Sequence, residues 1–127
     1  MRAIDTNVLV RLVIRDDPKQ TRLAEAFVAG GAWVSQLVLA EALWVLGSYY
    51  GLARGRIANV VEQILNGEAA IVQDADVVRA ALDLYRASNG VGFSDCLVLA
   101  IARKAGHAPL ATFDKTFARL EGVERLA

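Results

Sequence analysis

Short apolar segments alternate with longer helical segments along the whole chain, and this alternation constrains the fold more than any other feature. The expected strands are short and mostly apolar. They cover residues 3–4, 32–34, 69–72, 109–112 and 123–126. Strands that alternate with helices predict a mostly parallel sheet with helices on both of its faces.

The expected helices are marked by capping residues and by apolar residues at helical spacing. They cover residues 8–14, 18–29, 36–49, 54–66, a segment that follows Asp74, 95–105 and 114–120. Asp17 before Pro18 is a typical helix start, because proline fits the first helical position. Ser94 is expected to cap the helix over residues 95–105.

Length and composition limit the class of protein. The chain has 127 residues, which predicts one domain over residues 1–127. The chain has 14 lysine and arginine residues in total and 14 aspartate and glutamate residues in total, so its net charge is zero. This excludes a protein that coats nucleic acid by bulk positive charge. Cys96 is the only cysteine, which fits a reducing compartment. No apolar run approaches the ~20 residues of a membrane span, so we expect a cytoplasmic protein without membrane contact.

Four acidic residues stand where an α/β fold places its ligand site. Asp5 and Asp114 follow the first and fourth expected strands, and Asp95 opens the sixth expected helix. Ligands of such sheets bind beyond the carboxyl ends of the strands. Glu41 lies within a helix, with apolar residues three and four positions away on either side. A carboxylate in such an apolar stripe is costly unless it is paired or binds a cation.

Each acid taken alone also has a purely structural explanation. Asp5 and Asp114 could only cap helices, Asp95 could only complement a helix dipole, and Glu41 could pair with a distant arginine. If the four converge, their mutual repulsion calls for a cation. Oxygen ligands without histidine or cysteine select Mg²⁺ or Mn²⁺. The chemistry that suits such a site is metal-assisted hydrolysis of a phosphodiester.

The ordered set of motifs around these acids resembles PIN-domain ribonucleases, and more narrowly the VapC-type toxins of toxin–antitoxin pairs. The resemblance covers the whole chain. Its motifs are Asp5-Thr6-Asn7, Leu39-Ala40-Glu41, Phe93-Ser94-Asp95 and Thr112-Phe113-Asp114. It implies a three-layer α/β/α sandwich around a five-stranded parallel sheet of order 3-2-1-4-5.

The resemblance also implies an activity and partners. These are metal-dependent endonucleolytic cleavage of RNA, a homodimer, and inhibition by a cognate antitoxin protein. The implied catalytic and metal-binding residues are Asp5, Glu41, Asp95 and Asp114. Asp114 matches the fourth acid, which varies more among members of the family than the other three. In the family, the acidic site is supported by hydroxyl or amide groups at certain further positions. The residues that match these positions are Thr6, Asn7 and Thr112.

Two arginines extend from the expected acid site. Asn7, Arg11 and Arg15 recur every four residues along one face of the first helix. Arg11 and Arg15 are therefore candidates for contact with the RNA backbone or with a carboxylate of the antitoxin. A solvated helix face explains the same pattern equally well.

Other classes of protein fit the sequence less completely. A receiver-type signalling module that binds Mg²⁺ needs an acid pair after the first strand, where this chain has only Asp5, and it leaves Glu41 unexplained. A phosphatase with an aspartate nucleophile needs a second aspartate close to Asp5. A catalytically silent PIN-like domain that only binds partners is the third alternative.

Overall fold

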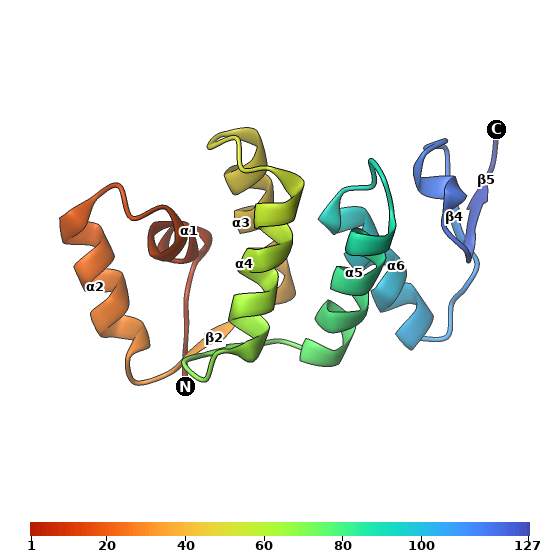
Figure 1. Ribbon diagram of the computed structural model, residues 1–127. Coiled ribbons are helices and arrows are strands. Elements are labelled where there is room, and N and C mark those ends of the chain that lie inside the picture. Colours follow the sequence, from red (N-terminus) through yellow and green to blue (C-terminus); the bar gives the residue numbers. More distant parts are fainter. The chain divides into compact units, whose positions relative to one another are not determined.

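Strands and helices alternate along the chain as the sequence predicts. The computed structural model describes residues 1–127 and divides into two units, Met1–Ala75 (unit 1) and Asp76–Ala127 (unit 2). The elements of unit 1 are β1 (Arg2–Ala3), α1 (Thr6–Ile14), α2 (Pro18–Val28), β2 (Ala32–Val34), α3 (Gln36–Ser48), α4 (Arg54–Asn66) and β3 (Ala70–Val72) (Figure 1). The elements of unit 2 are α5 (Ala75–Ala87), α6 (Phe93–Lys104), β4 (Leu110–Thr112), the 3₁₀ helix η1 (Phe117–Arg119) and β5 (Val123–Arg125).

The sheet of unit 1 places the start of α1 at the carboxyl end of its edge strand. β2 is the central strand and pairs in parallel with β1 and β3. The Ile4 N–H donates to the carbonyl of Trp33 at 3.1 Å, so the ladder continues to the residue before Asp5. The chain then turns into α1, whose N-cap is Asp5.

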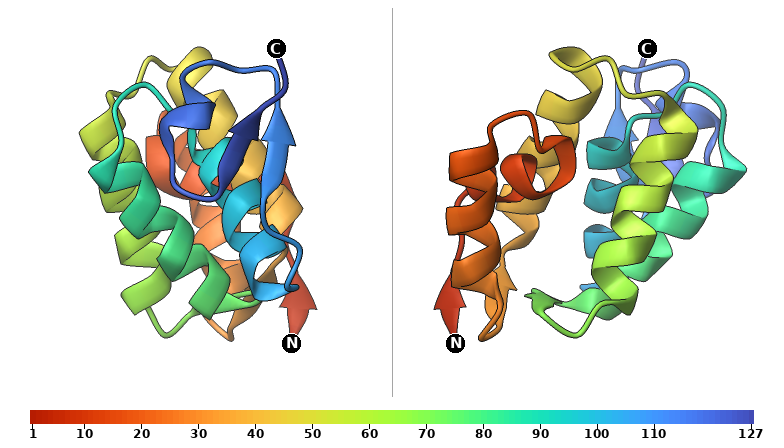
Figure 2. Two further views of the ribbon diagram at one scale, coloured as in Figure 1. Left: turned by 90° about the vertical axis from the view of Figure 1, so that its right-hand side faces the viewer. Right: turned by 60° about the vertical axis from the view of Figure 1, so that its left-hand side comes forward.

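Helices α3 and α4 supply most of the buried core of unit 1. α3 buries Leu39, Ala42, Leu43 and Leu46, and α4 buries Ile57, Ala58, Val60 and Val61. α1 packs against both α2 and α3, and its closeness to α2 is visible in Figure 2. The N-terminus of α1 is therefore held by packing on two sides.

Unit 2 is built from a helix pair and a parallel strand pair. α5 buries Val78 and Leu82, α6 buries Cys96 and Leu99, and the two helices lie side by side (Figure 2). β4 pairs with β5 in parallel, with Leu110 opposite Val123. The single cysteine, Cys96, lies in this buried core.

The strands pair differently from the single five-stranded sheet that the sequence predicts. All five expected strands form, but as a three-stranded sheet of order β1-β2-β3 and a two-stranded sheet of β4 and β5. The neighbours within each sheet agree with the predicted order 3-2-1-4-5. β1 has only two residues, because the chain enters α1 soon after Ala3.

Three helix starts also differ from the predictions. α6 begins at Phe93 after the N-cap Gly92, so Ser94 lies inside the helix and does not cap it. Phe93 is buried against Tyr85, with ring centroids 5.7 Å apart, and this packing fixes the first turn. The expected helix over residues 114–120 is only the short η1. α1 starts at Thr6, two residues early, because Asp5 caps it.

None of the helices is long and apolar enough to cross a membrane.

Candidate active site

Asp5 and Glu41 line one small pocket of unit 1. Asp5 caps α1, and its Oδ1 accepts a hydrogen bond of 2.7 Å from the Thr6 N–H. Glu41 lies on α3, and its Oε2 accepts a hydrogen bond of 3.1 Å from the Thr6 hydroxyl. The pocket has a volume of about 260 Å³, and Asn7 and Arg11 also line it. Five of the six site residues predicted in unit 1, all except Arg15, therefore line this pocket.

Glu41 is exposed, which contradicts the expectation that it is a buried carboxylate. α3 is apolar nearly all round, so apolar neighbours at helical spacing do not identify its buried face. Leu37 and Trp44, one turn away on either side of Glu41, are 78% and 66% exposed. A burial penalty therefore does not require a cation at Glu41. The feature that supports a cation at Glu41 is instead the pocket that this residue shares with Asp5.

Asp95 and Asp114 form the second pair of acids, in unit 2. Asp95 lies in the first turn of α6 and is partly buried. Desolvation by this burial and, second, the negative charge of Asp114 raise the pKa of Asp95 above its ordinary value. The two carboxylates are thus close enough to repel each other.

Asp114 also organises the turn after β4. Its Oδ1 accepts hydrogen bonds from the backbone N–H groups of Thr116 at 2.8 Å and Phe117 at 3.1 Å. Its own N–H donates to the hydroxyl of Thr112 at 3.0 Å. Thr112 therefore stabilises the turn that carries Asp114, and its role in a metal site stays a prediction.

The carboxylate oxygens of the two pairs of acids are ligands that suit a hard divalent cation. Each unit contains two of the four predicted acids, and neither unit has a group of three or more acidic, histidine or cysteine side chains that could hold a metal ion. Mg²⁺ keeps several waters and is commonly held by one or two carboxylates together with substrate phosphates. A pair of acids is therefore sufficient to take part in such a site. The convergence of all four acids on one site stays a prediction.

The two arginines of the first helix have different partners. Arg11 lines the pocket with Asp5 and Glu41, and its Nη1 lies 2.5 Å from Oδ1 of Asp16. Desolvation opposes ionisation of Arg11, but the Asp16 carboxylate and Tyr50 outweigh it and raise the pKa of Arg11. Arg15 ends α1 in a left-handed conformation and pairs instead with Glu25 on α2. Of these two arginines, Arg11 is the one at the acidic pocket.

Nothing in the sequence pattern points to the partners of Arg11. Asp16 follows the end of α1, outside the helical spacing that relates neighbours on one face. Tyr50 follows α3, and its position beside α1 depends on how these helices pack. Both residues hold Arg11 through tertiary contacts that periodicity does not encode.

Comparisons with known proteins match nearly the whole chain. A family model described as "PIN domain" matches residues 3–123, a range that includes all four candidate acids. A protein from Aquifex aeolicus (strain VF5) described as "VapC ribonuclease" is 30% identical over 125 residues, which cover 94% of this chain and 92% of that protein. No solved structure is significantly similar to the chain. The chain belongs to the PIN domain family, whose α/β fold its alternating strands and helices share.

Proposed function

We propose that the chain is a metal-dependent endoribonuclease and the toxin of a toxin–antitoxin pair. The observation that carries this proposal is the pocket in which Asp5 and Glu41 meet at the carboxyl end of β1. The pair Asp95 and Asp114 lies at the start of α6 and the end of β4 in unit 2. The ribonuclease from Aquifex aeolicus, similar over 94% of this chain, supports RNA as the substrate.

Asp5, Glu41, Asp95 and Asp114 are the residues that would hold Mg²⁺ or Mn²⁺. A divalent ion at such a site lowers the pKa of water and offsets negative charge on the phosphodiester during hydrolysis. Thr6 engages one oxygen of Asp5 and one oxygen of Glu41. The second oxygen of each carboxylate can therefore bind a cation while Thr6 holds the first.

Arg11 and Asn7 are the residues of unit 1 that would position the RNA. Both line the pocket of Asp5 and Glu41. The net charge of the chain is zero, so affinity for the phosphate backbone depends on local cations. The Arg11 guanidinium, held by Asp16, can bind a phosphate oxygen close to the acids.

The proposed toxin function implies two protein partners, an antitoxin and a second copy of the chain, and a place in the cell. We infer that a cognate antitoxin inhibits the enzyme and that the chain forms a homodimer in the cytoplasm. The exposed Leu37 and Trp44 on α3 provide apolar surface for a protein contact. An adjacent gene for a small DNA-binding protein would favour the antitoxin, and sedimentation of the purified chain tests the dimer.

The direct test is cleavage of RNA by the purified chain. We expect Mg²⁺ or Mn²⁺ to support cleavage of a mixed pool of cellular RNA, and EDTA to stop it. Asp5→Asn, Glu41→Gln and Asp95→Asn should each abolish cleavage. Asp83→Asn, an exposed acid on α5, is the matched control and should retain full activity. Cleavage that survives the three site substitutions would refute the proposal, and binding of Mg²⁺ without cleavage of any RNA would favour the receiver-type or silent alternatives.

A further inference from the structure

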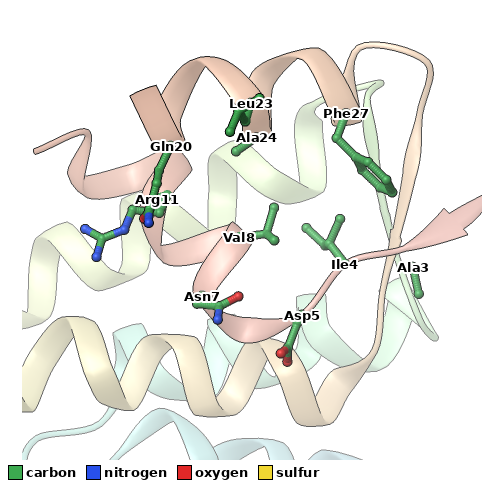
Figure 3. A pocket seen from close by; sticks show the side chains of 10 residues that line it. All are labelled: Ala3, Ile4, Asp5, Asn7, Val8, Arg11, Gln20, Leu23, Ala24 and Phe27. Atoms are coloured by element: carbon green, nitrogen blue, oxygen red, sulfur yellow. The ribbon is translucent and has the colours of Figure 1, made fainter. Parts of the chain in front are cut away.

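A groove of about 520 Å³ lies between α1 and α2, next to the acidic pocket. Its wall is mostly apolar, and its polar lining residues are Asp5, Asn7, Arg11 and Gln20. The lining residues on which the inference depends are Ile4, Val8, Gln20, Leu23 and Phe27. Figure 3 shows Ile4 and Val8 directed toward α2, while the Asp5 carboxylate points away from them. The backbone start of α1 therefore presents apolar side chains to the groove, while the carboxylate of Asp5 is directed away from them.

The groove and the acidic pocket share three of their lining residues. Asp5, Asn7 and Arg11 line both of them. A ligand with its phosphate beside Arg11 and the acids can therefore extend an attached group past the start of α1 into the groove. Neighbouring nucleotides of an RNA strand have this arrangement, with a charged backbone and flat apolar bases.

The groove wall has the composition that receives an unstacked base. Leu23 is 64% exposed, which leaves apolar surface without a protein partner. The guanidinium of Arg2 lies 3.8 Å from the ring centroid of Phe27 and holds this aromatic side chain in place. Gln20 carries an amide that can both donate to and accept from the edge of a base. Sequence-specific recognition of single-stranded RNA uses such apolar or aromatic faces together with hydrogen bonds to base edges.

We propose that this groove binds a nucleobase of the RNA substrate, adjacent to the phosphodiester at the acids. The proposal rests on the proposed ribonuclease function and assigns to Gln20, Leu23 and Phe27 a part in selecting the RNA sequence. The base lies against Leu23 and Phe27, and the Gln20 amide reads its edge. A protein segment from a partner is the competing occupant, and the experiment below separates the two.

The test is a titration of the full chain, observed through its side-chain methyl signals by NMR. The four nucleoside 5′-monophosphates are compared with ribose 5-phosphate, which has the same sugar and phosphate but no base. We expect the nucleotides to shift the methyl signals of Ile4, Val8 and Leu23 through the ring current of the base. Ribose 5-phosphate should leave these signals unchanged.

Two variants and one control sharpen the test. Leu23→Ala should weaken nucleotide binding about fivefold or more, in the range found for loss of a base-stacking contact. Gln20→Ala should reduce the differences in affinity among the four nucleotides. Leu126→Ala removes another exposed leucine, after β5 and outside the groove, and should leave nucleotide binding unchanged.

The outcomes separate the groove from the ribonuclease proposal. Methyl signals that do not move, or that move equally with ribose 5-phosphate, would overturn the base-binding groove, even if the chain cleaves RNA. Groove shifts caused only by a peptide from a protein partner would assign the groove to protein binding instead. Base-dependent shifts in a chain that cleaves no RNA would support the groove and overturn the ribonuclease proposal.

Discussion

The hydroxyl of Thr6 donates a hydrogen bond to Glu41, and the backbone N–H of the same residue donates to Asp5. One residue thus links the carboxylate that follows β1 to a carboxylate on α3, 36 positions along the chain from Asp5. Thr6 thus orients both of the acids that we propose as metal ligands. Residues that orient metal ligands in this way contribute strongly to metal affinity.

Replacement of Thr6 by valine tests this link. Thr6→Val keeps the branched shape and the backbone N–H but removes the hydroxyl that holds Glu41. We expect the affinity for Mn²⁺ to fall about tenfold, as measured by calorimetric titration. Thr6→Ser retains the hydroxyl and should restore the affinity. Equal affinities for all three proteins would show that the hydrogen bond does not orient a metal ligand.

Glu41→Gln tests the metal site through stability, without knowledge of the RNA target. At a free concentration about 100 times its Kd, Mn²⁺ should stabilise the wild type by about 2.7 kcal/mol. For a domain of this length this corresponds to a rise in Tm on the order of 10 °C. A thermal melt of Glu41→Gln should show a much smaller rise, whereas Asp83→Asn should behave as the wild type. A full shift in Glu41→Gln would exclude this residue from the metal site.

Asp5 has two separable roles, as a helix cap and as a candidate metal ligand. Asp5→Ala removes the oxygen that caps α1 and should lower the free energy of unfolding by about 1 kcal/mol. Asp5→Asn keeps a side-chain oxygen that can accept the hydrogen bond from Thr6, so this variant should unfold in urea at nearly the wild-type midpoint. Both variants should lose RNA cleavage. Activity in Asp5→Asn would mean that Asp5 serves only as a cap.

Much of the fold follows from local sequence signals. The helix over Arg54–Asn66 and the strand over Ala32–Val34 have the predicted bounds, because caps and apolar spacing are local properties. Asp17 caps α2 as predicted, with Pro18 in the first turn. The pairing of strands within each sheet does not follow from such local signals. It depends on contacts between segments far apart in the sequence.

The candidate site is predictable to a similar degree. Strand ends and motif order locate Asp5 and Asp114, and the structure places each of them at the expected turn. The predicted environment of Glu41 was wrong because α3 is apolar on both its buried and exposed faces. The bond from Thr6 to Glu41 and the contact of Tyr50 with Arg11 arise from the packing of α1 against α3, and Asp16 reaches Arg11 from the segment after α1. No spacing rule within one helix encodes such contacts.

Asp95→Asn should stabilise the metal-free protein at neutral pH. Burial and the charge of Asp114 raise the pKa of Asp95, so its ionised form is disfavoured in the folded state. For an acid with a raised folded pKa, this cost is absent below the unfolded pKa, near 3.8, and grows as the pH rises through the folded value. Urea unfolding in EDTA should therefore show similar stability for both proteins at low pH and a more stable variant at pH 7. The addition of Mn²⁺ should reverse the order, and a variant that is less stable at pH 7 in EDTA would contradict the raised pKa.

Arg11 and Arg15 form a matched pair for testing contact with RNA. Arg11→Ala should weaken RNA binding and cleavage, because Arg11 lies at the acidic pocket, whereas Arg15→Ala removes a cation paired with Glu25 and should have little effect. If Arg11 binds one phosphate, the slope of log affinity against log salt concentration should become shallower by about 0.7 in Arg11→Ala, the value for a single-stranded nucleic acid.

Replacement of both arginines by glutamate should abolish cleavage while the Mn²⁺-induced rise in Tm persists. Unchanged cleavage in the double variant would show that this helix face is only solvated, and an equal loss in Arg15→Ala would mean that the RNA follows the whole face of α1.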